Sequence, residues 1–246
     1  MKENEMIFGL RAVIETLRAG KEIDKILIRR GEPQSELYKE LLEALRGRDI
    51  TLRRIPQEGL DRLTRKNHQG VIAFLPAVEY QRLEDIIPRV YEEGRNPFVV
   101  LLDGVTDVRN FGAIARTCEC AGVDAIVIPT HGSVSVNADA MKTSAGALNI
   151  LPVCREKSIN HTIHFLQASG LKVIATAAQA ADNYTTVDCN GPLAIVMGAE
   201  DTGVAAENLR ICDHIVGIPQ FGSINSLNVS VASSILIYEV VRQRMA

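Results

Sequence analysis

Apolar segments and helix-period patterns alternate along the last 150 residues of the chain, beginning near Phe98. Short runs that are apolar throughout predict strands at residues 98–102, 125–128, 150–153, 172–175, 193–197 and 214–217. Apolar residues at helical spacing predict helices at 113–121, 138–147, 159–168 and 227–242. Strands without polar positions are typical of a parallel sheet whose two faces are both covered by helices. Residues 97–246 are therefore predicted to form one α/β domain.

A smaller pattern of the same kind precedes this domain. Helices are expected at residues 8–19, 35–45 and 57–64, and strands at 25–28, 50–54 and 71–75. These elements predict a separate small α/β domain over residues 1–76. The segment that follows has proline at both ends, many charges and one weak helix around 83–93 that Pro88 is expected to break. We therefore expect a linker at residues 77–96.

Three predicted strands of the second domain end in polar segments that contain glycine. The segments are residues 103–116, 197–203 and 218–230. Ligands of open α/β sheets bind at the carboxyl ends of the strands. The sequence therefore predicts one composite site built from all three segments.

Individual side chains of the first two segments leave two interpretations open. Asn110 lies near a predicted helix start, where it either caps the helix or faces a ligand. Arg116 either grips a phosphodiester or is a solvated helix residue, and Gly112 is expected to keep the surface between them bare. In the second segment Gly198 allows a close backbone approach. Glu200 is either a ligand group or a cap for the turn after Gly203.

The third segment has more polar groups than one helix start requires. Residues 223–226 carry several hydroxyl and amide side chains, of which one suffices for a cap. The helix predicted to follow, at 227–242, is apolar on nearly every side. Such a helix must be buried, either beneath the sheet or against a second subunit.

Bulk composition excludes some classes of protein. The chain is 46% hydrophobic and 23% charged, has no apolar run near the roughly 20 residues that cross a bilayer, and begins without an apolar signal-peptide core. We expect a cytoplasmic protein with no membrane partner. The five cysteines form no CxxC pair, so buried free thiols are expected. His161 and His164 have no third ligand in view, so no metal site is expected.

The net charge of −3 conceals an asymmetry between the two predicted domains. Residues 1–76 hold 15 Lys/Arg and 12 Asp/Glu, whereas residues 77–246 hold 12 and 18. The first domain concentrates basic residues in one stretch: Arg46, Arg48, Arg53, Arg54, Arg62, Arg65 and Lys66. Such a cluster suits phosphate contacts, although a solvated charged face is an equal alternative.

Common nucleotide-binding motifs are missing. Neither G-x-G-x-x-G nor G-x-x-x-x-G-K-[ST] occurs, and the first strand of the second domain lacks a glycine-rich exit. A nucleoside cofactor would therefore have to bind in another way.

In order, the three polar segments resemble the three motifs of the SpoU/TrmH family within the SPOUT superfamily. The matching residues are 110–116 (NFGAIAR), 197–200 (MGAE) and 226–232 (SLNVSVA). The resemblance covers residues 97–246. It implies a trefoil-knotted, parallel-sheet SPOUT methyltransferase domain. It also implies an RNA ribose 2′-O-methyltransferase that uses S-adenosyl-L-methionine (AdoMet).

The resemblance also assigns roles to residues. The implied catalytic residues are Arg116, Asn110, Glu200, Ser226 and Asn228. The implied cofactor-binding residues are Thr176, Met197, Gly198, Ile218, Pro219, Ser226 and Leu227, largely through backbone groups. A guanidinium resists deprotonation, so a phosphate clamp that favours a developing alkoxide is easier for Arg116 than the role of general base.

The first domain extends the resemblance. Residues 7–14 and 67–72 look like the ends of the ribosomal-protein-like, substrate-binding domain of some family members. This domain favours the branch that methylates a guanosine of 23S ribosomal RNA, although Asp201-Thr202 departs from that branch. The alternatives are a tRNA 2′-O-methyltransferase of the same family, a catalytically silent RNA-binding module, and an α/β enzyme acting on a small nucleotide. Family members pair through the knot region, so a homodimer through the C-terminal domain is expected.

Overall fold

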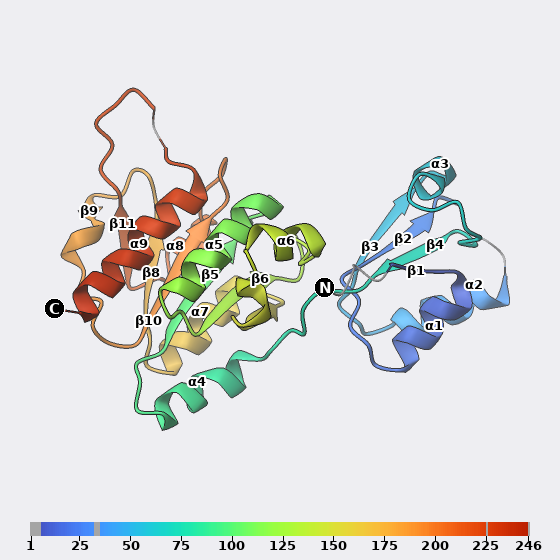
Figure 1. Cartoon of the computed structure of the whole chain (residues 1–246), viewed down its shortest axis with the longest axis horizontal. Helices are drawn as coiled ribbons and strands as arrows, with labels where there is room; N and C mark the ends of the chain where they lie inside the picture. Colours follow the sequence, from blue (N-terminus) through green and yellow to red (C-terminus); the bar gives the residue numbers. More distant parts are fainter. Residues whose placement is uncertain (1–5, 32–34, 225, 246) are drawn as a thin grey trace. The chain divides into compact units, whose positions relative to one another are not determined.

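The computed structural model describes residues 6–31, 35–224 and 226–245 of the chain. The chain divides into two compact units, Met1–Ala77 and Val78–Ala246 (Figure 1). Each unit has its own sheet and its own apolar cores.

The first unit is a four-stranded sheet in the order β1-β4-β2-β3. Its strands are β1 (Met6–Phe8), β2 (Lys25–Arg29), β3 (Thr51–Ile55) and β4 (Val71–Phe74). Helices α1 (Leu10–Arg18) and α2 (Glu36–Leu45) pack on one face and α3 (Gln57–Asp61) on the other. The helix predicted from residue 8 begins two residues later, because Phe8 pairs with Ile72 in β1, a strand that the apolar pattern did not reveal.

The prediction of a linker at residues 77–96 is wrong for most of that segment. Residues from Val78 onward belong to the second unit, and α4 (Leu83–Glu92) runs through Pro88 without a break. The helix is anchored by four buried side chains, those of Leu83, Ile86, Ile87 and Val90. Pro88 lies on the exposed face, where water can satisfy the carbonyl that loses its helical hydrogen bond.

The second unit confirms the predicted parallel sheet. Its seven strands pair in parallel in the order β7-β6-β5-β10-β8-β11-β9. They are β5 (Phe98–Asp103), β6 (Ala125–Pro129), β7 (Val153–Glu156), β8 (Lys172–Thr176), β9 (Asp182–Asn183), β10 (Leu193–Gly198) and β11 (His214–Gly217). The strand predicted at 150–153 is displaced: Ile150 is 71% exposed and follows a 3-10 turn, η1 (Ala147–Asn149).

Helices cover both faces of this sheet. They are α5 (Val108–Cys120), α6 (Ala138–Thr143), α7 (Ile159–Ala168), α8 (Ala206–Leu209) and α9 (Val229–Arg244), with a second 3-10 turn, η2 (Tyr184–Thr186). One core lies between the sheet and α5, α6 and α9, and the other between the sheet and α4 and α7. Along β5, Val100 faces the first core and Val99 the second, as expected for a strand buried on both sides.

The last helix is less buried than its apolar sequence predicts. It begins at Val229, two residues later than predicted, with Asn228 as its N-cap. Leu236, Ile237 and Val240 are buried, but Val231 and Tyr238 are 47% and 49% exposed. One stripe of α9 therefore faces solvent in a single chain.

Two further expectations concern membranes and metals. Within the described ranges, no helix is long and apolar enough to cross a membrane. The same part of the chain contains no group of three or more His, Cys, Asp or Glu residues that could hold a metal ion. His161 and His164 are both exposed.

The strand order sets the position of the functional segments. β10 lies at the centre of the sheet between β5 and β8, with Gly198 level with Asp103, and β11 lies beside β8, with Val216 level with Thr176. The carboxyl ends of β5, β10, β8 and β11 therefore meet along one edge of the sheet.

Candidate functional site

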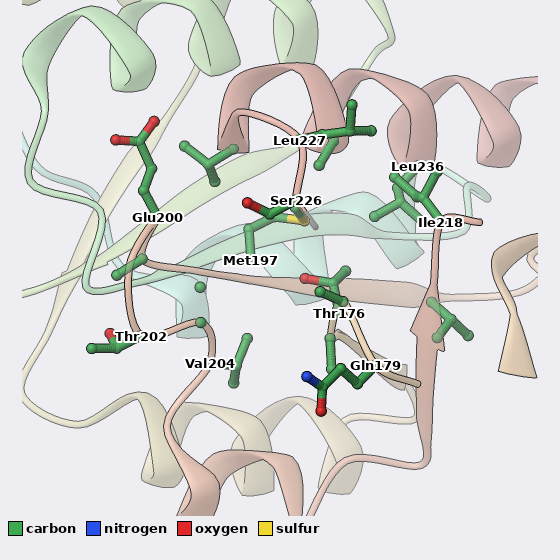
Figure 2. A pocket seen from close by; sticks show the side chains of 18 of the residues that line it. Thr176, Gln179, Met197, Glu200, Thr202, Val204, Ile218, Ser226, Leu227 and Leu236 are labelled. Atoms are coloured by element: carbon green, nitrogen blue, oxygen red, sulfur yellow. The ribbon is translucent and has the colours of Figure 1, made fainter. Parts of the chain in front are cut away.

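A cavity of about 450 Å³ opens at this edge of the sheet (Figure 2). Its walls come from the ends of β8, β10 and β11, the loops that follow them, and the first turns of α9. Its volume lies within the range of small-molecule sites. Six of the predicted cofactor-binding residues line it: Thr176, Met197, Gly198, Ile218, Ser226 and Leu227. Pro219 is not among its lining residues.

The chain approaches itself closely at Gly198. A Cβ atom on this residue would lie 2.0 Å from the backbone carbonyl carbon of Gly203 and 2.1 Å from the amide nitrogen of Val204. The loop between them closes with two backbone hydrogen bonds of 3.1 and 3.0 Å between Ala199 and Gly203. Glycine at 198 is therefore required by packing, and Gly203 turns back with a φ of 68°.

The lining is mostly apolar, and its charge is negative. Met197, Val204, Ile218, Leu227 and Leu236 contribute aliphatic walls (Figure 2). The lining residues include two carboxylates, Glu200 and Asp201, and, in the described part of the chain, no lysine or arginine. The pocket therefore suits an uncharged or cationic ligand better than one that carries phosphates.

Three polar side chains from the three motifs form one hydrogen-bonded network. The Nδ2 atoms of Asn110 and Asn228 each donate to Oε1 of Glu200 over 2.7 Å. Nδ2 of Asn228 also donates to Oδ1 of Asn110 over 3.1 Å. Hydrogen bonds of amides to a carboxylate are stronger than bonds between neutral groups. The network therefore ties the first turn of α5 and the loop after β10 to the start of α9.

The network rules out the capping functions that the sequence left open for Asn110 and Glu200. The N-cap of α5 is Asp107, whose Oδ1 accepts from the amides of Arg109 and Asn110 over 2.9 Å, so Asn110 does not cap the helix. The helix begins five residues before the predicted Ala113, which places Asn110 in its first turn. Glu200 does not cap the turn after Gly203, because its Oε1 accepts from the two asparagines.

Asn228 has two functions in the fold. Its Oδ1 accepts from the backbone amide of Ser230 over 2.9 Å and from the hydroxyl of Ser230 over 2.6 Å, which caps α9. Its Nδ2 is thereby turned toward Glu200. A single side chain thus fixes both the start of α9 and one end of the network.

Asp103 and Asn208 are positioning residues that the sequence reasoning missed. Oδ2 of Asp103 accepts from the backbone amide of Ala205 and from Nδ2 of Asn208, both over 2.8 Å. These bonds hold the segment that leaves the Gly203 turn against the end of β5. An Asp-Gly pair such as Asp103-Gly104 is typical of a turn, and Gly104 does have a φ of 85°. No short-range pattern reveals a partner more than 100 residues away.

Arg116 lies apart from the other predicted catalytic residues. Six residues separate it from Asn110, which places it about 9 Å farther along α5 and on a different side of the helix. It is exposed, is not part of the pocket lining, and has no hydrogen bond or ion pair with any residue that the structure describes. Its neighbour Thr117 contacts Ser234 of α9 over 3.1 Å. A single chain therefore brings Glu200 and Ser226 to the lining of the pocket, and it ties Asn110 and Asn228 to Glu200 by hydrogen bonds. It does not bring Arg116 to either.

Gly112 has a different function from the expected one. It is buried, and a Cβ atom there would lie 2.6 Å from the side chain of Thr143 in α6. The interpretation that Gly112 leaves a bare surface is therefore wrong. It allows α5 and α6 to pack closely.

The five cysteines are free, but not all are buried. Cys118, Cys154 and Cys189 are buried, Cys212 is partly buried, and Cys120 is exposed. Burial raises the pKa of the Cys154 and Cys212 thiols to about 12. These thiols are protonated at neutral pH and are poor nucleophiles.

Comparisons with known proteins identify the family to which both units belong. The model of the SpoU rRNA Methylase family matches residues 97–238, and the model of the RNA 2′-O ribose methyltransferase substrate binding domain matches residues 6–81. YacO of Bacillus subtilis strain 168, a protein assigned to the TrmH family of tRNA/rRNA methyltransferases, is 32% identical over 243 residues, which are 99% of this chain and 97% of YacO.

Two solved structures of RNA-modifying enzymes have a similar fold. An AdoMet-bound rRNA methyltransferase from Sinorhizobium meliloti is 26% identical, with a TM-score of 0.60 over 96% of this chain and 86% of that one. The TrmH/SpoU tRNA modifying enzyme of A. aeolicus is 29% identical, with a TM-score of 0.57 over 66% of this chain and 84% of its own. The chain therefore belongs to the SpoU/TrmH family of RNA methyltransferases.

Proposed function

We propose that this RNA methyltransferase transfers a methyl group from AdoMet to the ribose 2′-hydroxyl of a guanosine in 23S ribosomal RNA. The observation that carries the proposal is the network of Asn110, Glu200 and Asn228 at an apolar, acidic pocket. It joins the three motifs of the family at the carboxyl edge of the sheet.

The pocket fits the family's cofactor. AdoMet carries a sulfonium cation and no phosphate, and the lining supplies two carboxylates, aliphatic walls and, as far as the chain is described, no basic side chain. A nucleoside triphosphate or dinucleotide would need cations or a glycine-rich cradle for its phosphates. The lining therefore supports AdoMet over the small-nucleotide alternative. Thr176, Met197, Gly198, Ile218 and Leu227 would hold it, with Pro219 and Ser226 shaping the loop.

The residues of the chain then have to position the acceptor. When bound, AdoMet supplies an activated methyl group. Glu200 is held by two amide donors, so its free oxygen faces a fixed direction from which it can accept a hydrogen bond from a ribose hydroxyl. Arg116 would bind the adjoining phosphate and stabilise negative charge that develops on the 2′-oxygen. Most of the rate effect would come from this alignment, with proton removal a smaller part.

Arg116 requires a second chain in this proposal. It is exposed and has no hydrogen bond or ion pair with a residue that the structure describes. The next residue, Thr117, contacts α9, whose Val231 and Tyr238 are about half exposed. Two copies that pair through α5 and α9 would cover the apolar stripe and bring Arg116 of one copy to the pocket of the other. We therefore propose a homodimer through the C-terminal unit.

Mixing two impaired variants tests this arrangement. Arg116→Ala and Glu200→Gln each damage every site of their own homodimer. If Arg116 acts on the partner's pocket, the mixed dimer contains one site in which both residues are intact, so the mixture should be more active than either variant alone. A mixture that is no more active than its components, together with a monomeric mass in analytical ultracentrifugation at micromolar concentration, would contradict the dimer.

The first unit supports RNA as the substrate. All seven basic residues of the predicted cluster, from Arg46 to Lys66, are exposed, and none forms an ion pair within the described ranges. Exposed cations without an acidic partner can neutralise phosphates. Deleting residues 1–76 should leave AdoMet binding intact and abolish RNA methylation.

Coverage favours ribosomal RNA over transfer RNA. The S. meliloti rRNA methyltransferase matches almost the whole chain, whereas the A. aeolicus tRNA modifying enzyme matches only 66% of it. A tRNA substrate is the second candidate, because YacO and similar relatives carry both RNA classes in their names. Tritiated methyl transfer to 23S RNA fragments and to total tRNA, measured side by side, separates the two.

A catalytically silent RNA-binding module is the remaining alternative. The intact network and pocket argue against it. Calorimetry that detects no AdoMet binding, with RNA binding preserved, would favour it instead.

Two further features complete the proposal. The insertion of β10 between β5 and β8 is compatible with the family's trefoil knot, in which we expect the segment leading to α9 to be threaded through an earlier loop. A ribosomal RNA substrate also implies that the protein acts in the cytoplasm.

A further inference from the structure

The loop between β11 and α9 carries two large apolar side chains in open solvent. Phe221 is 98% exposed and Ile224 is 74% exposed. The loop projects from the second unit in Figure 1, where it is drawn in red. A Phe side chain gives up roughly 1.5–3 kcal/mol by remaining in water instead of being buried. An aromatic side chain that is this exposed beside a ligand pocket suggests that a binding partner covers it.

The loop is anchored at the pocket on both sides of these residues. Ile218 and Gln220 line the pocket before the tip, and Ser226 and Leu227 line it afterwards. Adjacent Cα atoms are about 3.8 Å apart. Phe221 directly follows Gln220 and therefore stands at the mouth of the pocket, outside its lining.

The chemistry of the loop limits what it can bind. Residues 215–238 contain no charged side chain. The loop therefore cannot attract phosphate through side-chain charge, but an exposed aromatic ring can stack on a flat, uncharged nucleobase. A ribose whose 2′-hydroxyl reaches into the pocket has to carry its base just outside the mouth. Proteins that recognise RNA by sequence commonly bind unstacked bases on aromatic side chains.

We propose that Phe221 is the stacking platform for the base of the target nucleotide, with Ile224 as its apolar neighbour. This inference rests on the proposed RNA methylation. Phe221 acts as a positioning residue: it holds the unstacked base so that the attached ribose stays at the pocket. The competing occupant of the loop is the second copy of the chain.

A single tryptophan distinguishes the two occupants. The chain contains no Trp, so Phe221→Trp introduces the only indole into the protein. With AdoMet present, a 23S RNA fragment that contains the target should quench the emission of this indole, because a stacked guanine quenches tryptophan. The matched control is Tyr238→Trp on α9, whose side chain is 49% exposed. Its emission should follow protein concentration through dimerisation and should not respond to RNA.

Substrate kinetics give an independent readout. Phe221→Ala should weaken RNA binding roughly 5- to 100-fold, the range for one lost base–aromatic stack. AdoMet affinity and dimer mass should stay unchanged. Phe221→Tyr should restore RNA affinity and Phe221→Leu should not, because leucine retains apolar area but has no ring.

Two results would overturn the inference and are distinguishable from failure of the proposed function. If the wild-type protein methylates RNA but the indole of Phe221→Trp does not respond to it, the stacking role is wrong. The same holds if that emission shifts to the blue with protein concentration alone, because the loop is then a subunit contact. A wild-type protein that methylates no RNA overturns the proposed function, and this inference with it.

Discussion

Glu200 and Arg116 belong to the same predicted site but are prepared for function to very different degrees. The Glu200 carboxylate is fixed by two amides at 2.7 Å, each from a different motif. The Arg116 guanidinium lies in solvent without a partner in the described part of the chain. One chain therefore preorganises the pocket and its polar network, whereas Arg116, the residue that we propose binds phosphate, is left exposed.

The largest effect on activity is expected at Arg116. Arg116→Ala should lower kcat by roughly 10²- to 10³-fold, as for the loss of one donor to a developing oxyanion. AdoMet affinity should stay within twofold, because Arg116 does not line the pocket. Steady-state kinetics and calorimetry measure the two effects. Near-normal turnover of Arg116→Lys at saturating RNA would show that the two-pronged guanidinium is not needed.

At the pocket, the largest effect is expected on protein stability, at the close backbone contact of Gly198. Gly198→Ala places a methyl group about 2 Å from backbone atoms of Gly203 and Val204, so the loop must move. We expect a loss of about 3 kcal/mol, which lowers Tm by roughly 6–12 °C for a protein of this size. Gly191→Ala is the matched control, because its Cβ would have no atom within 4 Å. Equal melting temperatures for both variants would contradict the structure of the loop.

Glu200→Gln should have an intermediate effect. The substitution keeps the size of the side chain but removes the anionic acceptor of Asn110 and Asn228. Hydrogen bonds to a charged group are worth about 1.5–3 kcal/mol, so kcat/KM should fall roughly 10- to 100-fold. Asp201→Asn removes a charge from the same pocket wall without touching the network, and should change kcat/KM less. If the two variants lose equal activity, the network has no special function.

The smallest effect is expected at Asp103. Asp103→Asn leaves one acceptor and introduces a donor opposite the amides of Ala205 and Asn208. A cost of about 1 kcal/mol should weaken AdoMet binding roughly fivefold and change turnover little. Calorimetry with AdoMet provides the measurement. Unchanged AdoMet affinity would show that the hydrogen bonds from Ala205 and Asn208 to Asp103 do not support the pocket.

The sequence predicts the framework of the second unit well, because fully buried strands appear as apolar runs. Residues 193–197 and 159–168 are examples in which the predicted and observed elements nearly coincide. The prediction failed where the pattern is ambiguous. Pro88 predicts a break in a helix that tertiary burial maintains, and the strand predicted at 150–153 lies three residues later.

The candidate site was predictable as a set of residues but not as a geometry. Polar groups at strand ends indicated Asn110 and Glu200, and the family resemblance added Asn228. The hydrogen bonds that join the three side chains could not be predicted from their spacing. Asp103 and Asn208 escaped notice because their contact joins positions 105 residues apart. The exposure of Phe221 was also hidden, since an apolar residue in a loop sequence gives no sign of whether it is buried.

The most direct test of the account maps where the methyl group is attached. The purified protein is incubated with AdoMet and 23S RNA fragments, and the product is cleaved with alkali, which requires a free 2′-hydroxyl at each cut. The account predicts a single gap in the cleavage ladder at one guanosine, absent with Arg116→Ala. Methyl transfer without a gap, which would place the methyl group on a base, would contradict it.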